Sequence, residues 1–261
     1  MSPSPTLDVQ RILIVRDDRL YADALAHSAL LVFPAARVTI VTSVQSAVAV
    51  LANGSFDLLI TGLGSSIGGD VLELLMWWVS RHGPNAQRVL VVTAERQYRT
   101  LDALRKLAIA GVFDSQQEPP EGLAAVLKAV TTGGRYWSRS LQDCLSQAKV
   151  SSTPLSYLLT NGESVVLSIV GDGSDDSDAA RQLGISVSTV STIRRDLHRK
   201  LGVQHRGELL RFAAQNGFVQ FTPAGVVRPG FALFSAEYYE RRMRRSRTPT
   251  PLLQPICPSL R

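Results

Sequence analysis

The amino-acid sequence predicts an α/β domain with a doubly wound, five-stranded parallel sheet, followed by a smaller all-α domain of four helices. Five short apolar runs in the first half, with helical spacing between them, predict the first domain. The region from about 156 to 219 shows only helical patterns, which predicts the second. A chain of 261 residues is long enough to form both cores.

The five apolar runs are the expected strands. They are RILIV (11–15), RVTIV (37–41), DLLIT (57–61), RVLVV (88–92) and AGVF (110–113). Segments such as LYADALAHSALLVF separate them with helical spacing, so each strand is expected to be buried on both faces. In such a sheet, functional groups gather beyond the carboxyl ends of the strands.

The domain boundaries follow from composition. We expect the α/β domain at 1–134, a linker at 135–155 and the helical domain at 156–219. The stretch KVSSTP is typical of a linker, although LQDCLSQA could form a short helix. Residues 220–261 are rich in arginine and proline, and we expect a basic, mostly disordered extension. Within it, AEYYERRMRRSR (236–247) is a short basic helix candidate, either a solvated tail or an added non-specific DNA contact.

Charge is unevenly distributed along the chain. Residues 151–261 carry 14 basic and 9 acidic side chains, whereas residues 1–150 carry 14 and 13. The positive second half favours a polyanionic partner. The two cysteines and four histidines have no metal-ligand spacing, and we expect neither a metal nor a cofactor. No apolar run approaches the roughly 20 residues of a membrane helix, and the N-terminus lacks a secretory pattern, so we expect a cytoplasmic protein.

Residues 178–203 carry the strongest functional pattern, that of a helix-turn-helix. Gly184 suits the left-handed end of a first helix, and Ser186 is a good N-cap for a second. The second helix has an apolar stripe at Val190, Ile193, Leu197 and Leu201. Its opposite face is polar and basic, with Ser191, Thr192, Arg194, Arg195, Arg199 and Lys200. Reading the DNA major groove requires such a helix, whereas a solvated basic surface helix is the alternative interpretation.

The surrounding motifs resemble the C-terminal four-helix module of the LuxR/NarL/FixJ transcription regulators. The matching residues are LTNGESVVL, then ISVSTV, then KLGVQHRGEL, and the resemblance covers 159–219. It implies base-edge contacts for Ser191 and Thr192, and a groove or phosphate contact for Arg195. It also implies phosphate contacts for Thr189, Arg199, Lys200 and Arg206, with Arg194 as a weaker candidate.

The sequence departs from this family at several positions. Ser191 and Ile193 stand where members usually carry lysine and histidine. Asp175, Asp176 and Asp178 make the start of the first helix acidic. These acids either cap the helix dipole or weaken DNA binding by repelling phosphate, and both interpretations remain open.

The α/β domain resembles the receiver domain of response regulators over roughly residues 11–133. In working receivers, two acids and an acceptor aspartate hold Mg²⁺, and a hydroxyl and a lysine contact the phosphoryl group. Here Arg16 and Asp17 take the two acidic positions, and Gly62 takes the position of the acceptor. Thr93 matches the hydroxyl, and Ser115 falls at or next to the lysine. Because glycine has no nucleophile, we predict a pseudo-receiver in which Arg16 replaces the metal and holds Asp17.

Two other interpretations of this edge of the sheet fit the residues less well. A shift of one residue would restore an acid pair, Asp17 and Asp18, but no acceptor, and Asp57 begins its strand at the wrong end. The stretch GLGSSIGG suggests a nucleotide loop, but Ile67 stands where a dinucleotide fingerprint needs its third glycine. No catalytic constellation accompanies it, and we do not expect an enzyme.

Together these patterns predict a response-regulator-type transcription factor that binds promoter DNA as a dimer without phosphorylation. The expected partners are double-stranded promoter DNA and a second copy of the chain, with another regulator or RNA polymerase as further candidates. We expect these contacts in the nucleoid rather than at a membrane. The alternative is an adaptor that forms heterodimers with other regulators and binds DNA weakly alone.

Overall fold

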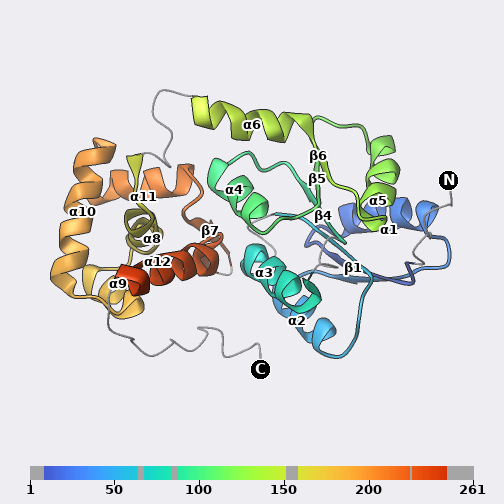
Figure 1. Cartoon of the computed structure of the whole chain (residues 1–261), viewed down its shortest axis with the longest axis horizontal. Helices are drawn as coiled ribbons and strands as arrows, with labels where there is room; N and C mark the ends of the chain where they lie inside the picture. The colour runs from blue at the N-terminus through green and yellow to red at the C-terminus, as the bar shows by residue number, and fades with distance from the viewer. Residues whose placement is uncertain (1–8, 64–67, 84–87, 151–157, 224, 246–261) are drawn as a thin grey trace.

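The computed structural model describes residues 9–63, 68–83, 88–150, 158–223 and 225–245. Figure 1 shows an α/β domain and a helical domain side by side, with the last helix lying along the helical domain and its start directed toward the α/β domain. Residues 64–67 of the glycine-rich stretch, including Ile67, lie outside the described residues.

The α/β domain is built on a parallel sheet with the strand order β2-β1-β3-β4-β5-β6. Its strands are β1 (Arg11–Val15), β2 (Arg37–Val41), β3 (Leu58–Thr61), β4 (Val89–Thr93), β5 (Gly111–Asp114) and β6 (Tyr136–Trp137). The expected five strands are present, and β6 adds a sixth beside β5. The Trp137 indole donates a hydrogen bond of 2.9 Å to the carbonyl of Ile109, which fixes this short strand to the sheet edge.

Helices cover both faces of the sheet, as a doubly wound fold requires. They are α1 (Arg19–Val32), α2 (Val44–Ala52), α3 (Val71–His82), α4 (Tyr98–Lys106), η2 (Pro120–Gly122) and α5 (Leu123–Thr131). The helices α1 and α5 enclose one apolar core with residues such as Ile12 and Leu58. The helices α2, α3 and α4 enclose the other, which continues into the helical domain.

The segment expected to be a linker, 135–155, is ordered over much of its length. After β6, the helix α6 (Arg139–Val150) packs against α4. Its Leu141 and Leu145 are buried one turn apart, so this helix belongs to the α/β domain. Residues 151–157, which include most of KVSSTP, lie outside the described residues.

The helical domain contains the four helices that the sequence predicts. They are α8 (Asn161–Val170), α9 (Asp176–Leu183), α10 (Val187–Leu201) and α11 (Arg206–Gln215). A capping box starts α8, because the Thr160 side chain accepts from the Glu163 backbone while the Glu163 carboxylate accepts from that of Thr160. The buried residues of α8 form the centre against which α9 and α10 pack.

The extension expected to be mostly disordered is ordered over 220–223 and 225–245. It forms a hairpin of β7 (Gln220–Thr222) and β8 (Gly225–Val227), followed by α12 (Phe231–Arg245). The reason is the apolar start of α12, where Phe234 is buried and Phe231 and Leu233 are partly buried against the core. Averaged over 220–261, the arginines and prolines mask this short apolar segment.

The helix α12 packs against both α8 and α3, and therefore joins the two domains. Lys106 of α4 pairs with Glu237 of α12 at 2.8 Å. The buried Arg99 guanidinium lies 4.0 Å from the ring centre of Phe234 and donates to Ser168 of α8 at 3.0 Å. No helix in the described part of the chain combines the length and apolar character needed to cross a membrane.

Candidate functional site

The helices α9 and α10 form a helix-turn-helix whose turn is set by Gly184 and Ser186. Gly184 adopts a left-handed conformation with φ 58° and ψ 40°, and it ends α9. The Ser186 hydroxyl accepts a hydrogen bond of 3.1 Å from the Thr189 backbone and so begins α10. The turn and the cap have the geometry that the sequence predicts.

The two faces of α10 also follow the predicted division. Val190 and Leu197 are buried, and Ile193 and Leu201 are partly buried against the same core. Away from this stripe, the side chains of Thr189, Thr192, Arg195 and Arg199 are exposed, and those of Ser191, Arg194 and Lys200 are half-buried. The helix therefore presents one polar, basic surface to solvent.

Three of the predicted DNA contacts are engaged within the protein. Arg194 pairs with Asp176 of α9 at 2.9 Å, and this ion pair fastens α10 to the start of the first helix. Lys200 pairs with Glu163 of the α8 capping box at 2.8 Å. Arg206, at the start of α11, donates to the carbonyls of Gly173 and Ser174.

The contact between Lys200 and Glu163 helps to lower the pKa of the Glu163 carboxyl group. Burial alone would raise the pKa of Glu163, but Lys200 and the Thr160 backbone N–H together hold that pKa below its ordinary value. Glu163 therefore stays ionised near neutral pH and keeps Lys200 in place.

Arg195 and Arg199 are the arginines of α10 that point outward. Arg199 pairs with Asp196 at 2.9 Å, but the Arg199 side chain is 71% exposed, and such surface pairs contribute little. Among the described residues no ion pair holds Arg195. Arg195 is thus the α10 cation most available to an external anion.

Each of the three aspartates at the acidic start of α9 makes a contact within the protein. Asp175 caps the helix by accepting from the Asp178 backbone at 2.8 Å. Asp176 holds Arg194, and Asp178 pairs with Arg181 on the same helix. These contacts favour the capping interpretation, and they also remove cationic charge from the surface of α10.

The five positions compared with a receiver lie together at the carboxyl edge of the sheet. Arg16 and Asp17 follow β1, Gly62 follows β3, Thr93 ends β4 and Ser115 follows β5. Because these strands are parallel and adjacent, their carboxyl ends share one edge. The Ser115 backbone donates to the Thr93 carbonyl at 3.0 Å, which joins two of these positions directly.

The Arg16 side chain fills the space beside Gly62. A Cβ atom on residue 62 would overlap the Arg16 guanidinium, with Cζ at 2.9 Å, so the two positions are complementary. The guanidinium also lies 4.4 Å from the centre of the Tyr21 ring. In the described part of the chain no ion pair joins Arg16 to Asp17, so Arg16 contacts Tyr21 rather than holding Asp17 as expected.

The neighbouring acids have other contacts. Asp18 is the N-cap of α1 and accepts from the Tyr21 backbone at 3.0 Å. Asp57 accepts from the backbones of Gln10 and Arg11 at 2.9 Å, at the amino end of β3, as its position in the sequence predicts. Over the described ranges, no group of three or more histidine, cysteine, aspartate or glutamate residues is arranged to hold a metal ion.

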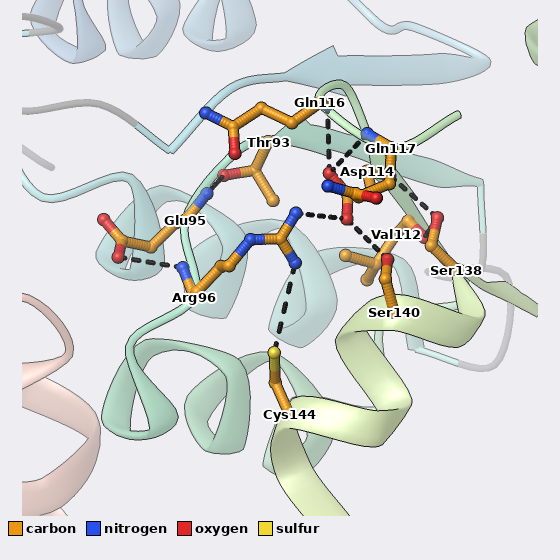
Figure 2. A network of polar contacts seen from close by, with 10 residues as sticks. All are labelled: Thr93, Glu95, Arg96, Val112, Asp114, Gln116, Gln117, Ser138, Ser140 and Cys144. Carbon is orange, nitrogen blue, oxygen red and sulfur yellow. Dashed lines mark hydrogen bonds and ion pairs between the residues drawn. The ribbon is translucent and has the colours of Figure 1, made fainter. Parts of the chain in front are cut away.

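A buried carboxylate at the end of β5 organises the rest of this edge (Figure 2). Asp114 pairs with Arg96 of the β4–α4 loop at 2.7 Å and accepts from Ser140 of α6. It also accepts from the backbone of Gln116 at 3.0 Å. Burial alone would raise the pKa of Asp114, but the hydrogen bonds from Ser140, Gln116 and Arg96 hold it below its ordinary value.

Asp114 and Arg96 were not predicted from the sequence. The available signal was an aspartate closing an otherwise apolar strand, GVFD, where a buried charge requires a partner. Thr93 has a local role beside this network, since its hydroxyl accepts from the Glu95 backbone at 2.9 Å. The edge of the sheet is thus occupied by an internal ion pair between the β4–α4 loop and β5, and Ser140 of α6 donates a hydrogen bond to the carboxylate of that pair.

Comparisons with known proteins agree with these two domains. The model of the family described as bacterial regulatory proteins, luxR family, matches residues 157–213. The CsgBAC operon transcriptional regulatory protein of Escherichia coli is 30% identical over 164 residues, covering 59% of this chain and 74% of that protein. The transcriptional regulatory protein MctR of Rhizobium johnstonii is 31% identical over 97 residues, which span 37% of this chain and 44% of that protein.

Solved structures show the same fold. RcsB from Salmonella enterica serovar Typhimurium, bound to promoter P1flhDC in the presence of phosphomimetic BeF3−, matches with a TM-score of 0.50 and 23% identity. That match covers 78% of this chain and 97% of RcsB. A structure of two RcsB dimers bound to two parallel DNAs matches with the same TM-score, over 79% and 98% of the two chains.

A receiver-like parallel sheet followed by a four-helix helix-turn-helix domain defines a DNA-binding transcription factor of the response-regulator type, rather than an enzyme. The chain belongs to the luxR family of bacterial regulatory proteins.

Proposed function

We propose that this protein reads promoter DNA as a homodimer, with α10 in the major groove, and that it does so without aspartyl phosphorylation. The observation that carries its phosphorylation-independent part is that the Arg16 side chain fills the space beside Gly62 at the edge of the sheet. Position 62 has no nucleophile, and the space beside it holds a guanidinium instead of a carboxylate. The neighbouring Asp18 and Asp57 are engaged in backbone hydrogen bonds elsewhere.

For the DNA contacts, the exposure of the α10 side chains supports a ranking. Arg195 is the main cation for the groove, beside base-edge contacts from Ser191 and Thr192. Thr189 and Arg199 are phosphate contacts on the same exposed surface. Lys200, Arg206 and Arg194 contribute less, because each already has a partner within the protein.

The dimers that a related protein forms on DNA support the proposal that this chain binds DNA as a homodimer. RcsB dimers bind DNA, and a two-fold symmetric protein reads a roughly palindromic site with one α10 in each half. A single helical domain with this internally paired α10 has few free cations, so two copies are needed for strong binding at physiological salt.

The experiment uses the full chain with genomic fragments at physiological salt, and its oligomeric state is measured in the same buffer. We expect retention of specific fragments by the dimer. Failure of the dimer to retain any fragment would overturn DNA reading by the chain alone. It would favour the second candidate function, an adaptor that forms heterodimers, which the internal pairing of Arg194 and Lys200 supports.

A separate experiment tests phosphorylation. The chain is incubated with acetyl phosphate and Mg²⁺, and phosphoaspartate is detected by mass spectrometry, with a phosphorylatable receiver as the positive control. We expect no modification and unchanged DNA affinity. Phosphoaspartate at any position, or affinity that rises with acetyl phosphate, would overturn the phosphorylation-independent part of the proposal.

A further inference from the structure

The helix α12 lies outside the four-helix module, and its basic end reaches the turn of the helix-turn-helix. The hydroxyl of Tyr239 donates to the carbonyl of Gln182 at 3.2 Å, and Arg242 donates to that of Gly184 at 3.4 Å. Figure 1 shows the end of α12 beside α9. The tip of α12 is therefore held at the joint between the two DNA-reading helices.

This position is fixed by packing as well as by hydrogen bonds. The ring of Tyr238 lies against Gly162, where a Cβ atom would come within 3.1 Å of Cε2. Upstream of α12, Arg228 donates to Gln182 at 2.7 Å and also pairs with Asp172. These contacts attach α12 and the segment before it to α8 and α9 at several points.

The end of α12 is strongly cationic. Its last residues, 241–245, read RRMRR and contain four arginines and no acid. The side chains of Arg241 and Arg242 are exposed. They differ in direction, because Arg241 lines the cleft between the domains, whereas Arg242 contacts the helix-turn-helix turn.

The distance to the expected DNA path is short. Gly184 and Ser186, the N-cap of α10, are two residues apart, at most about 7 Å of chain. The major groove that admits such a helix is about 12 Å wide and is edged by phosphates. A guanidinium beside Gly184 is thus within reach of the phosphates that flank the groove entered by α10.

We infer that the C-terminal turn of α12 is a second DNA-contacting surface that binds backbone phosphates beside the α10 groove. This inference rests on the proposed function and adds an element to it. It also complements α9, whose acidic start offers no free cation for phosphate, whereas Arg242, which none of the ion pairs among the described residues includes, lies at the other end of that helix. The contact is with the backbone, so it strengthens binding without selecting a sequence.

The test compares salt dependence in Arg242→Gln with that of the wild-type chain, on a retained genomic fragment and on an unrelated duplex. Each lost phosphate contact lowers the slope of log affinity against log salt by about 0.9, so we expect a decrease of about 0.9 on both duplexes. The lysine variant, Arg242→Lys, should keep the wild-type slope because it keeps the charge.

The matched control is Arg37→Gln, which removes the same charge from an exposed position on the α/β domain. An equal loss in this control would show a net-charge effect and overturn the inference. An unchanged slope in Arg242→Gln would also overturn it while leaving DNA reading by α10 intact. If the wild-type chain binds neither duplex, the inference and the proposed function fail together.

Discussion

Arg194 and Arg195 are adjacent on α10, and replacing each with alanine tests the assignment of the DNA-reading face. Arg195 is exposed, whereas Arg194 is held by Asp176 at 2.9 Å with 39% of its side chain exposed. Removing a groove-contacting arginine costs about 1–3 kcal/mol of binding free energy. Arg195→Ala should therefore weaken specific binding about 5- to 150-fold, with the free energy of unfolding unchanged.

Arg194→Ala is expected to show the opposite pattern. The ion pair is only partly buried, so its loss should lower the free energy of unfolding by about 1 kcal/mol, while DNA affinity falls by less than about threefold. Affinity is measured by fluorescence anisotropy on a retained promoter fragment, and stability by urea unfolding. Equal affinities for Arg195→Ala and the wild type, or a larger binding loss for Arg194→Ala, would refute the orientation assigned to α10.

Three further predictions concern the α/β domain. Burial, with Glu73 nearby, raises the pKa of Asp70 from its ordinary 3.8 to about 7, so the folded state binds the proton more tightly than the unfolded state does. Stability should fall by at most about 1.4 kcal/mol per pH unit between pH 4 and 7, and Asp70→Asn should flatten this urea-unfolding profile. Asp114→Ala leaves Arg96 unpaired and should cost about 2–3 kcal/mol in urea, and Asp114→Asn less; equal stability of Asp114→Ala and the wild type would contradict this. Gly62→Ala should cost about 1 kcal/mol in the wild type and almost nothing in an Arg16→Ala background, because the cost comes from overlap with that side chain; additive costs would exclude this origin.

The sequence predicts the helix-turn-helix well because its determinants are local. The left-handed Gly184, the Ser186 cap and the three- and four-residue apolar spacing each act within one or two helical turns. The partners of the basic residues are less local. Asp176 lies 18 residues before Arg194, and Glu163 lies 37 before Lys200, so periodicity alone could not show which cations are engaged.

The distinction between local and distant contacts also explains where the structure differs from the predictions for the α/β domain and the extension. The strand β6 has only two residues and depends on pairing with β5, which no local pattern encodes. The expected contact between Arg16 and Asp17 assumed that the cation would stand where a receiver binds its metal, whereas the guanidinium lies over Tyr21, in the first turn of α1. In the extension, the expectation of disorder came from the overall composition, which hides a four-residue apolar segment, FALF, that anchors α12.

The contact between the two domains combines polar and apolar side chains. A cleft of about 600 Å³ lies between α4, α8 and α12. Beside it, the buried Arg99 donates to Ser168 of α8 and lies over the Phe234 ring of α12. The apolar start of α12 packs against the core that the two domains share, and the same helix brings Arg242 to the turn between α9 and α10.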